Sequence, residues 1–326
     1  MNDKLTVHPI SVAPMMDWTD RHCRYFMRLL SPNVQLYTEM ITAAAIQHGD
    51  ALTLLRFDEA EHPVAVQLGG SDVQSMAHAA RLAGELGYDE ININVGCPSD
   101  RVQIGQFGAC LMAEPKLVAD CVSAMQEMTD VPVTVKTRIG IDELDSYEYL
   151  ANFVEIVAAA GCRKFVVHAR IAILAGLSPK ENRSVPPLNY DRVFALKRAF
   201  PQLQIVLNGG VTDSGDVGSL LDQVDGVMIG RRAYHEPYFL AELEQAYLSG
   251  KQPPDRRAVV TEMIPYIERE LAEGERLNRI TRHMLGLFAR QPGARSWRRT
   301  ISETAHRRGA GVEVLLAALD AVPEAA

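Results

Sequence analysis

The sequence lacks a long apolar run, a secretion signal and any paired-cysteine motif. No stretch approaches the roughly 18 consecutive apolar residues that a membrane-spanning helix requires. The first ten residues, MNDKLTVHPI, have neither the basic region nor the apolar core of a signal peptide. The five cysteines are scattered, with no CxxC pair and no Cys/His cluster, so they predict neither zinc nor a disulfide framework. These absences predict a cytoplasmic protein with free thiols, no membrane association and no bound metal.

Lysine is absent after Lys251, and arginine takes its place. Between residues 276 and 308 there are nine arginines and one acidic residue, Glu303. The net charge of −8 for the whole chain argues against a nucleic-acid partner. A local basic field is more informative than the total charge, however, and this one predicts a polyanionic partner for the C-terminal quarter.

Eight short apolar runs alternate with longer amphipathic stretches in the first three quarters of the chain. The expected strands cover residues 8–15, 34–40, 63–70, 91–96, 131–137, 164–170, 204–210 and 225–231. Helical patterns lie between them at residues 76–87, 116–128, 146–161 and 189–200. Eight such units in about 240 residues match the size of a TIM (β/α)8 barrel. A doubly wound sheet is the competing fold, but its GxGxxG fingerprint is missing.

The pattern changes after residue 248. The segment SGKQPPDRR (249–257) is polar and proline-rich, and only helical patterns follow it. We therefore expect two domains, an α/β TIM barrel over residues 1–248 and a small all-α helical bundle over residues 249–326 that carries the arginines.

Two glycine-containing loops follow the last two expected strands. Asn208, Gly209 and Gly210 follow the seventh strand, and Gly230 with Arg231 follows the eighth. These loops of a barrel commonly bind phosphate, because glycine lets backbone N–H groups approach an anion and arginine adds charge-assisted hydrogen bonds. Ordinary glycine turns would be the alternative.

Other polar side chains at the strand ends suit a flavin. Lys136 would stabilise the negative charge of the reduced ring near N1 and O2, with His168 beside it. Gln67 both donates and accepts hydrogen bonds, as the pyrimidine edge requires. Pro14, Met15 and Met16 would contact the ring with backbone and soft apolar groups.

Cys97 lies within the stretch ININVGCPSD (91–100), where an expected strand meets a turn imposed by Pro98. A buried structural thiol is one interpretation. No dedicated base stands beside it in the sequence, and an unassisted thiol with a pKa of about 8.5 is mostly protonated at neutral pH. Proton donation is therefore the alternative role for Cys97, and sequence alone leaves both open.

Several motifs together resemble one family, the tRNA-dihydrouridine synthases. The resemblance extends over essentially the whole chain and is carried by these segments: APMM, VQLGG, INVGCPSDRVQ, GACLM, VTVKTRIG, VVHAR, GLSPKENR, LNGG and IGRRAY. GLSPKENR followed by PPLNYDRV is similar to the subfamily that modifies positions 20 and 20a of the tRNA D-loop. The overlapping segment HARIAILAGLSPK has Ile171 and Ala175 where lysines are common in that subfamily, so we expect the C-terminal arginines to contribute more of the RNA binding.

The resemblance implies a role for each matching residue. Cys97 would be the proton donor, and Asn94 would touch the target uracil. The implied FMN contacts are Pro14, Met15, Met16, Gln67, Lys136, His168, Asn208, Gly209, Gly210, Gly230 and Arg231. The implied tRNA contacts are Lys180, Arg183, Arg295, Arg298 and Arg299.

The implied reaction is reduction of the C5=C6 bond of a uridine, with hydride delivered from reduced FMN to C6 and a proton from Cys97 to C5. NADPH would reduce the flavin, visiting its face transiently, and we expect a monomer. Two alternatives remain: a flavin oxidoreductase acting on a free pyrimidine, like a dihydroorotate dehydrogenase, and a non-catalytic RNA-binding module. The first would not need the arginine cluster, and the second would leave the set of Lys136, His168 and Asn208 unexplained.

Overall fold

The computed structural model describes residues 5–323, which form two compact units. Of these residues, the first unit contains 5–16 and 35–230, and the second contains 17–34 and 231–323. The second unit is therefore built from two separate pieces of the chain. The sequence-based boundary at residue 248 differs from this division, because the segment 17–34 and the helices just after residue 230 pack with the C-terminal helices.

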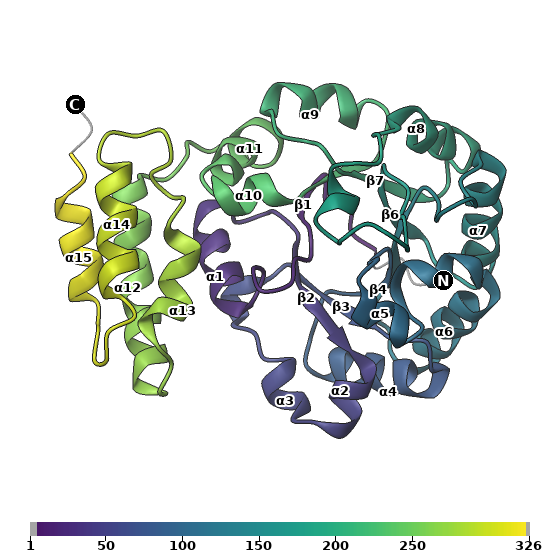
Figure 1. Cartoon of the computed structure of the whole chain (residues 1–326), viewed down its shortest axis with the longest axis horizontal. Helices are drawn as coiled ribbons and strands as arrows, with labels where there is room; N and C mark the ends of the chain where they lie inside the picture. Colours follow the sequence, from purple (N-terminus) through teal and green to yellow (C-terminus); the bar gives the residue numbers. More distant parts are fainter. Residues whose placement is uncertain (1–4, 324–326) are drawn as a thin grey trace. The chain divides into compact units, whose positions relative to one another are not determined.

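The first unit is a barrel of eight parallel strands in the order β1-β8-β7-β6-β5-β4-β3-β2 (Figure 1). Backbone hydrogen bonds between β1 and Gln35 join the two ends of this order. The strands are β1 (Ile10–Val12), β2 (Leu36–Thr42), β3 (Val64–Gly69), β4 (Glu90–Val95), β5 (Val133–Arg138), β6 (Lys164–His168), β7 (Gln204–Asn208) and β8 (Gly226–Ile229). The predicted TIM barrel is confirmed, and each of its strands overlaps an expected run.

Helices lie between the strands of the barrel. They are α2 (Ala43–His48), α3 (Ala51–Leu54), α4 (Val73–Glu85), α5 (Asp100–Ile104), α6 (Pro115–Met128), α7 (Tyr147–Ala159), α8 (Tyr190–Ala199) and α9 (Ser214–Leu221), with short 3-10 turns at η1 (Glu59–Glu61), η2 (Gly108–Ala113) and η3 (Glu181–Arg183). Local signals set their starts. Asp72, Ser146 and Asn189 cap α4, α7 and α8 by accepting hydrogen bonds from backbone N–H groups of the first turn.

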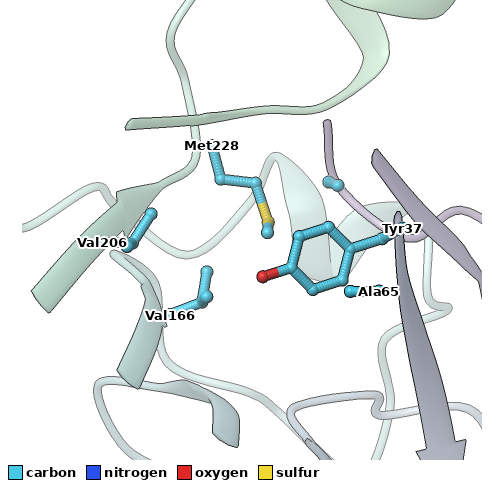
Figure 2. Packing of buried hydrophobic residues seen from close by; sticks show 6 residues of the cluster. Tyr37, Ala65, Val166, Val206 and Met228 are labelled. Carbon is cyan, nitrogen blue, oxygen red and sulfur yellow. The ribbon is translucent and has the colours of Figure 1, made fainter. Parts of the chain in front are cut away.

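The interior of the barrel is packed with side chains. Tyr37, Ala65, Val166, Val206 and Met228 form one buried apolar cluster contributed by five strands (Figure 2). Because side chains alternate between the two faces of a strand, residues two positions further along each strand also point inward. This alternation directs the polar strand ends toward the mouth of the barrel.

The second unit is all-helical. Its elements are α1 (Arg21–Leu30), α10 (Arg231–His235), α11 (Phe239–Tyr247), α12 (Arg256–Ala272), α13 (Leu277–Thr281), η4 (Arg282–Met284), α14 (Ala294–Thr304) and α15 (Glu313–Asp320). This helical content fits the expected helical bundle. It contains α1, although α1 precedes β2 in the sequence.

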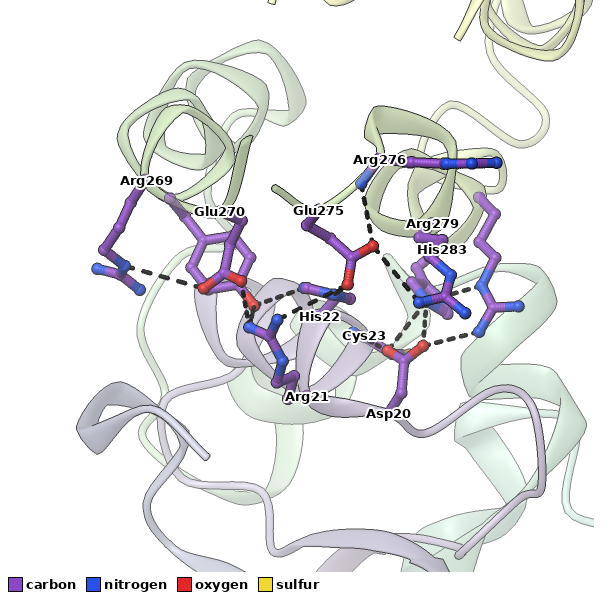
Figure 3. A network of polar contacts seen from close by, with 12 residues as sticks. Asp20, Arg21, His22, Cys23, Arg269, Glu270, Glu275, Arg276, Arg279 and His283 are labelled. Carbon is purple, nitrogen blue, oxygen red and sulfur yellow. Dashed lines mark hydrogen bonds and ion pairs between the residues drawn. The ribbon is translucent and has the colours of Figure 1, made fainter. Parts of the chain in front are cut away.

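Polar contacts attach α1 to the C-terminal helices (Figure 3). Arg21 forms an ion pair with the buried Glu270, and His22 Nδ1 lies 2.7 Å from the hydroxyl of Tyr266. At the start of α1, Asp20 forms ion pairs with Arg282 and His283 at 2.7 and 3.0 Å. Burial alone would raise the pKa of Asp20, but the hydrogen bond and charge of His283 hold it below its ordinary value.

Within residues 5–323, no helix is long and apolar enough to cross a membrane. The same residues contain no group of three or more His, Cys, Asp or Glu side chains arranged to hold a metal ion.

Candidate functional site

The carboxyl ends of neighbouring strands bring the sequence-predicted polar residues to one mouth of the barrel. Asn94 of β4 lies in register with Lys136 of β5, and His168 of β6 lies in register with Asn208 of β7. Gln67 of β3 lies beside them, hydrogen-bonded to Asn94. Residues far apart in the sequence are thus neighbours, as required of a site at the carboxyl end of a parallel barrel.

Cys97 lies in the turn that follows β4. The amide oxygen of Asn94 accepts hydrogen bonds from the backbone N–H groups of Gly96 (3.1 Å) and Cys97 (2.9 Å), which holds the turn in place. The thiol is half-buried and lies 3.5 Å from the hydroxyl of Ser99. In the described part of the chain, no histidine or carboxylate is within hydrogen-bond distance of the thiol. The site therefore offers a positioned thiol without an adjacent base.

Gly108 lets a second segment pack onto this turn. It has a φ of +73°, and a Cβ on it would lie 2.6 Å from the carbonyl oxygen of Cys97. The next residue, Ala109, donates its N–H to that same oxygen at 2.9 Å. A larger residue at position 108 would be strained by the positive φ and would clash with Val102 and with the Cys97 carbonyl oxygen.

Asn94 is the residue expected to touch uracil, and most of its amide is engaged within the protein. Its oxygen holds the Cys97 turn, and its Nδ2 donates to the Oε1 of Gln67 at 2.8 Å. The side chain is 9% exposed. One N–H of Asn94 is left for a ligand.

Lys136 and His168 bring two nitrogen-bearing side chains to the mouth. Lys136 has neither a hydrogen bond nor an ion pair among residues 5–323, and burial, together with the smaller effect of the Arg138 charge, lowers its pKa to about 7. Burial also holds the pKa of His168 well below its ordinary value, and the charges of Arg138 and Lys136 add to this effect. Within the same residues, His168 Nδ1 is buried without a hydrogen-bond partner. Such groups are costly unless a ligand satisfies them.

Arg138 connects the loops around the mouth. Its Nε donates to the carbonyl of Gly96 at 3.0 Å, and its NH1 donates to the carbonyls of Ile171 and Asn182, both at 2.9 Å. Arg138 is only 4% exposed. Arg138 directly follows the strand expected at residues 131–137, and the three carbonyls that it binds could not be identified from the strand pattern.

The loops after β7 and β8 have the expected backbone freedom. Gly209 and Gly210 have φ values of +110° and +75°. Asn208 donates its Nδ2 to the carbonyl of Met228 at 2.8 Å, which connects the ends of the two strands. A Cβ on Gly230 would meet nothing within 4 Å, so this loop borders open space.

The other predicted cofactor residues differ in how deeply they are buried and in the unit to which they belong. After β1, Met15 packs against the interior cluster, Pro14 is half-buried and Met16 is 53% exposed. Arg231 begins α10 and belongs to the second unit, whereas Gly230 ends the first.

The predicted RNA contacts occur in both units. Lys180 and Arg183 are exposed in the loop after β6. Asn182 between them is fully buried and organises that loop, because its amide bonds the N–H and the carbonyl of Ile173 and the carbonyl of Leu177. Lys180 and Arg183 are thus exposed to solvent on a loop whose backbone is held by the hydrogen bonds of Asn182.

In the second unit, α14 has a basic face and an apolar face. Trp297 and Ile301 are buried, whereas Arg295, Arg298 and Arg299 are exposed. None of the three arginines has an ion pair or hydrogen-bond partner for its guanidinium within residues 5–323. Arg295 lies in the first turn, where the helix dipole disfavours a cation. This placement therefore does not stabilise the helix.

Three site residues were not identified from the sequence: Arg138, Asn182 and Asn92. Asn92 occupies the middle of β4 and bonds Gln67 and Thr134. For Asn92, the available signal was the alternation of polar residues in the otherwise apolar β4. That alternation does not show which side chains the polar residues bond.

Comparison with known proteins gives one family. The family described as "Dihydrouridine synthase (Dus)" matches residues 11–323. A protein of Vibrio vulnificus named "tRNA-dihydrouridine(20/20a) synthase" is 60% identical, over 97% of this chain and 97% of its own length. A protein of Escherichia coli K12 with the same name is 56% identical, over 99% of this chain and 95% of its own.

Solved structures share the fold at much lower identity. A 2-naphthoyl-CoA reductase complex has a TM-score of 0.59 at 11% identity, covering 75% of this chain and 52% of its own. A morphinone reductase in complex with tetrahydroNAD has a TM-score of 0.52 at 11% identity, covering 76% of this chain and 89% of its own. At this identity the likeness concerns the barrel alone.

Proposed function

Since the chain belongs to the dihydrouridine synthase family, we propose that it reduces the C5=C6 bond of uridine to 5,6-dihydrouridine in the D-loop of tRNA, at positions 20 and 20a. The names of the relatives, which are 56–60% identical over nearly their whole length, support this substrate. The observation that carries the proposal is the Cys97 turn, held by Asn94 at the same barrel mouth as Lys136 and His168.

The residues of the mouth fit a flavin, and we assign FMN. Within residues 5–323, the buried Nδ1 of His168 has no partner and requires a hydrogen-bonding ligand, and the ammonium form of Lys136 favours an electron-rich one. The positive-φ glycines 209 and 210 present backbone without a side chain, as a phosphate site needs. Gly230 and Arg231 would contribute to the phosphate, and Gln67, Pro14, Met15 and Met16 to the ring.

When bound, reduced FMN supplies hydride for C6 of the uracil. C6 accepts it because the C5=C6 double bond is conjugated with the C4 carbonyl. Negative charge then develops at C5, and the Cys97 thiol donates its proton there. Lys136 and Arg138 are close enough to Cys97 to interact with it electrostatically. The free N–H of Asn94 hydrogen-bonds the base and fixes its position.

The exposed arginines of α14 bind the RNA in this proposal. A uridine must leave its stack to enter a barrel mouth, at a cost of a few kcal/mol that is least in a loop. Phosphate contacts from Arg295, Arg298 and Arg299, together with Lys180 and Arg183, offset that cost. A flavin enzyme acting on a free pyrimidine has no need of them.

We further assign NADPH as the reductant of the flavin. With no Rossmann fingerprint in the sequence, it would visit the flavin face and leave before the RNA enters. The acting species is a cytoplasmic monomer of two parts, a catalytic barrel and a helical RNA-binding part.

The test is to incubate the purified protein with FMN, NADPH and tRNA from cells that lack this gene, and then to map dihydrouridine by position. The proposal expects dihydrouridine at positions 20 and 20a and none when NADPH is omitted. A protein that contains flavin and oxidises NADPH but modifies no tRNA would overturn the substrate assignment. A colourless protein without flavin would overturn the cofactor assignment.

A further inference from the structure

A line of buried polar side chains runs through the barrel interior to the Cys97 turn. Glu90, Asn92 and Asn94 occupy alternate positions of β4 and therefore face the same side. Asn92 lies in register with Gln67 on β3 and with Thr134 on β5. Asn92 and Thr134 are 0% exposed and Gln67 is 1% exposed. Water does not reach these groups, so their hydrogen bonds must be satisfied by one another.

Glu90 is the starting point of the line. Its carboxylate accepts hydrogen bonds from Lys164 Nζ at 2.7 Å, Tyr37 OH at 2.7 Å and Thr134 Oγ1 at 2.6 Å. Burial alone would raise the pKa of Glu90, but the charge of Lys164 and these hydrogen bonds hold it below its ordinary value. An ionised carboxylate can only accept hydrogen bonds, so Thr134 must donate its single hydroxyl proton to Glu90.

The direction of each following hydrogen bond is then determined. Because Thr134 Oγ1 has no second proton, it can only accept from Asn92, which must present its Nδ2 (2.9 Å). The Oδ1 of Asn92 consequently faces Gln67 and accepts from its Nε2 at 2.8 Å. The Oε1 of Gln67 in turn accepts from Asn94 Nδ2 at 2.8 Å.

The orientation of the last amide in the chain, that of Asn94, determines whether the Cys97 turn is held. With its Nδ2 on Gln67, Asn94 presents Oδ1 to the N–H groups of Gly96 and Cys97. The opposite orientation would aim an amide N–H at two backbone N–H groups and release the turn. An isolated amide has two such orientations of similar energy, so the choice comes from its neighbours.

We infer that Glu90, Thr134 and Asn92 are positioning residues, which act through a one-directional hydrogen-bond chain to orient the amides of Gln67 and Asn94 and hold the Cys97 turn. This inference rests on the proposed function only in giving the Cys97 thiol its role as acid. The same chain orients the amide edge that Gln67 presents at the mouth. Buried amide networks of this kind are strong when every member is satisfied and fail when one link is removed.

The test compares Thr134→Val with Thr134→Ser in the full-length protein. Valine has nearly the shape of threonine without the hydroxyl, whereas serine retains the hydroxyl and loses a methyl group. Hydrogen exchange of the backbone amides of Gly96 and Cys97, followed by NMR, reports on the Asn94 bonds directly. We expect Thr134→Val to lower their protection at least about tenfold and Thr134→Ser to change it less than about twofold. Unchanged protection in Thr134→Val would overturn the inference.

An internal reference separates this effect from a general loss of stability. The reference is the backbone amide of Leu207 in β7, which is three strands away from β4 in the sheet. This amide should keep its protection in both variants. If Thr134→Val does not fold, Asn92→Leu breaks the next link, and the same amides are followed. Equal loss of protection at Gly96, Cys97 and Leu207 in every folded variant would show a structural role only and would also overturn the inference.

Activity then completes the test. With tRNA, we expect Thr134→Val to lower kcat for dihydrouridine at least about tenfold with little change in KM, and Thr134→Ser to restore it. A wild-type protein that makes no dihydrouridine would refute the proposed function, but the exchange result would still decide the hydrogen-bond chain. The two failures are therefore distinguishable.

Discussion

Lys136 is the residue whose surroundings most clearly require a ligand. It lies at the end of β5 without an anion among the described residues, and burial lowers its pKa to about 7. The free protein therefore holds it largely neutral above pH 7. A ligand with a negative or electron-rich edge favours the ammonium form, so binding and protonation must be coupled.

This coupling predicts the pH dependence of FMN affinity. Below pH 7 the ammonium is already present, and the affinity should be nearly constant. Above pH 7 each unit of pH adds the cost of protonating Lys136, about 1.4 kcal/mol, so the affinity should fall up to about tenfold per unit. Titration of the apoprotein with FMN between pH 6 and 9, followed by quenching of flavin fluorescence, measures it.

Lys136→Met is the matched variant for this measurement, because it retains the length of the side chain without the charge. It should bind FMN more weakly below pH 7 and show a flatter pH profile. Parallel profiles for the two proteins would mean that another group causes the dependence.

Cys97 provides a second prediction at this scale. Cys97→Ala should lower dihydrouridine formation by about 10²–10⁴-fold, the usual contribution of a general acid. Flavin content and NADPH oxidation should be retained, because these need neither the thiol nor its proton. Comparison of NADPH consumed with dihydrouridine formed, in single-turnover reactions with tRNA, checks both. Full activity of Cys97→Ala would exclude Cys97 as the acid.

At the scale of elements, α14 packs against the protein with one face and exposes its arginines on the other. Trp297 is fully buried, packs edge-on against Phe288 and donates its Nε1–H to the carbonyl of Met284 at 3.0 Å. Among residues 5–323, the arginines on the opposite face have no such contacts. Substitutions on the basic face should therefore leave the helix folded and change only what it binds.

The double variant Arg295→Ala, Arg298→Ala tests that face. Loss of two phosphate contacts should weaken tRNA binding and lower the slope of log K against log salt concentration by up to about 1.8. Flavin content should not change. Filter binding or fluorescence anisotropy with tRNA at several salt concentrations gives the slope.

Arg290→Ala is the control for this experiment. Arg290 is exposed, but its guanidinium lies 3.0 Å from the carboxylate of Glu236, so it already has an anionic partner within the protein. Its removal should leave the salt slope nearly unchanged. A double variant whose slope equals that of the wild type would exclude a docking role for the face.

At the scale of the whole molecule, α1 shows that the second unit is not a simple C-terminal appendage. Tyr25 stacks on Tyr266 with ring centroids 3.9 Å apart, and Arg21 pairs with the buried Glu270. These contacts join positions more than 240 residues apart in the sequence. The unit can be completed only after α12 and α13 have been synthesised.

We therefore predict that a fragment ending at residue 248 is defective. It would keep α1 but lose Tyr266, Glu270 and His283, leaving charged and aromatic groups of α1 without their partners. The expected result is aggregation, or a thermal unfolding midpoint several degrees or more below that of the full-length protein. Size-exclusion chromatography and circular dichroism melts check it. A soluble fragment with an unchanged midpoint would contradict this account of α1.

Much of the barrel was predictable because its signals are local. Each strand includes a short apolar run, and helices such as α4 and α7 begin at a capping side chain, Asp72 and Ser146 respectively. Cys97, Lys136 and His168 could be assigned to one mouth because parallel strands in a barrel present their carboxyl ends together. The family resemblance, carried by the same motifs, is confirmed.

The sequence by itself thus determined the strand and helix pattern, the barrel and the family. Only the tertiary structure decided which amide bonds which, that Arg138 binds three loop carbonyls, and that α1 packs with the C-terminal helices. The physical reason is the distance along the sequence over which each kind of interaction acts. Backbone propensity and apolar periodicity act over a few neighbouring residues, whereas a buried hydrogen bond depends on strand register and on partners that the chain brings together only when it folds.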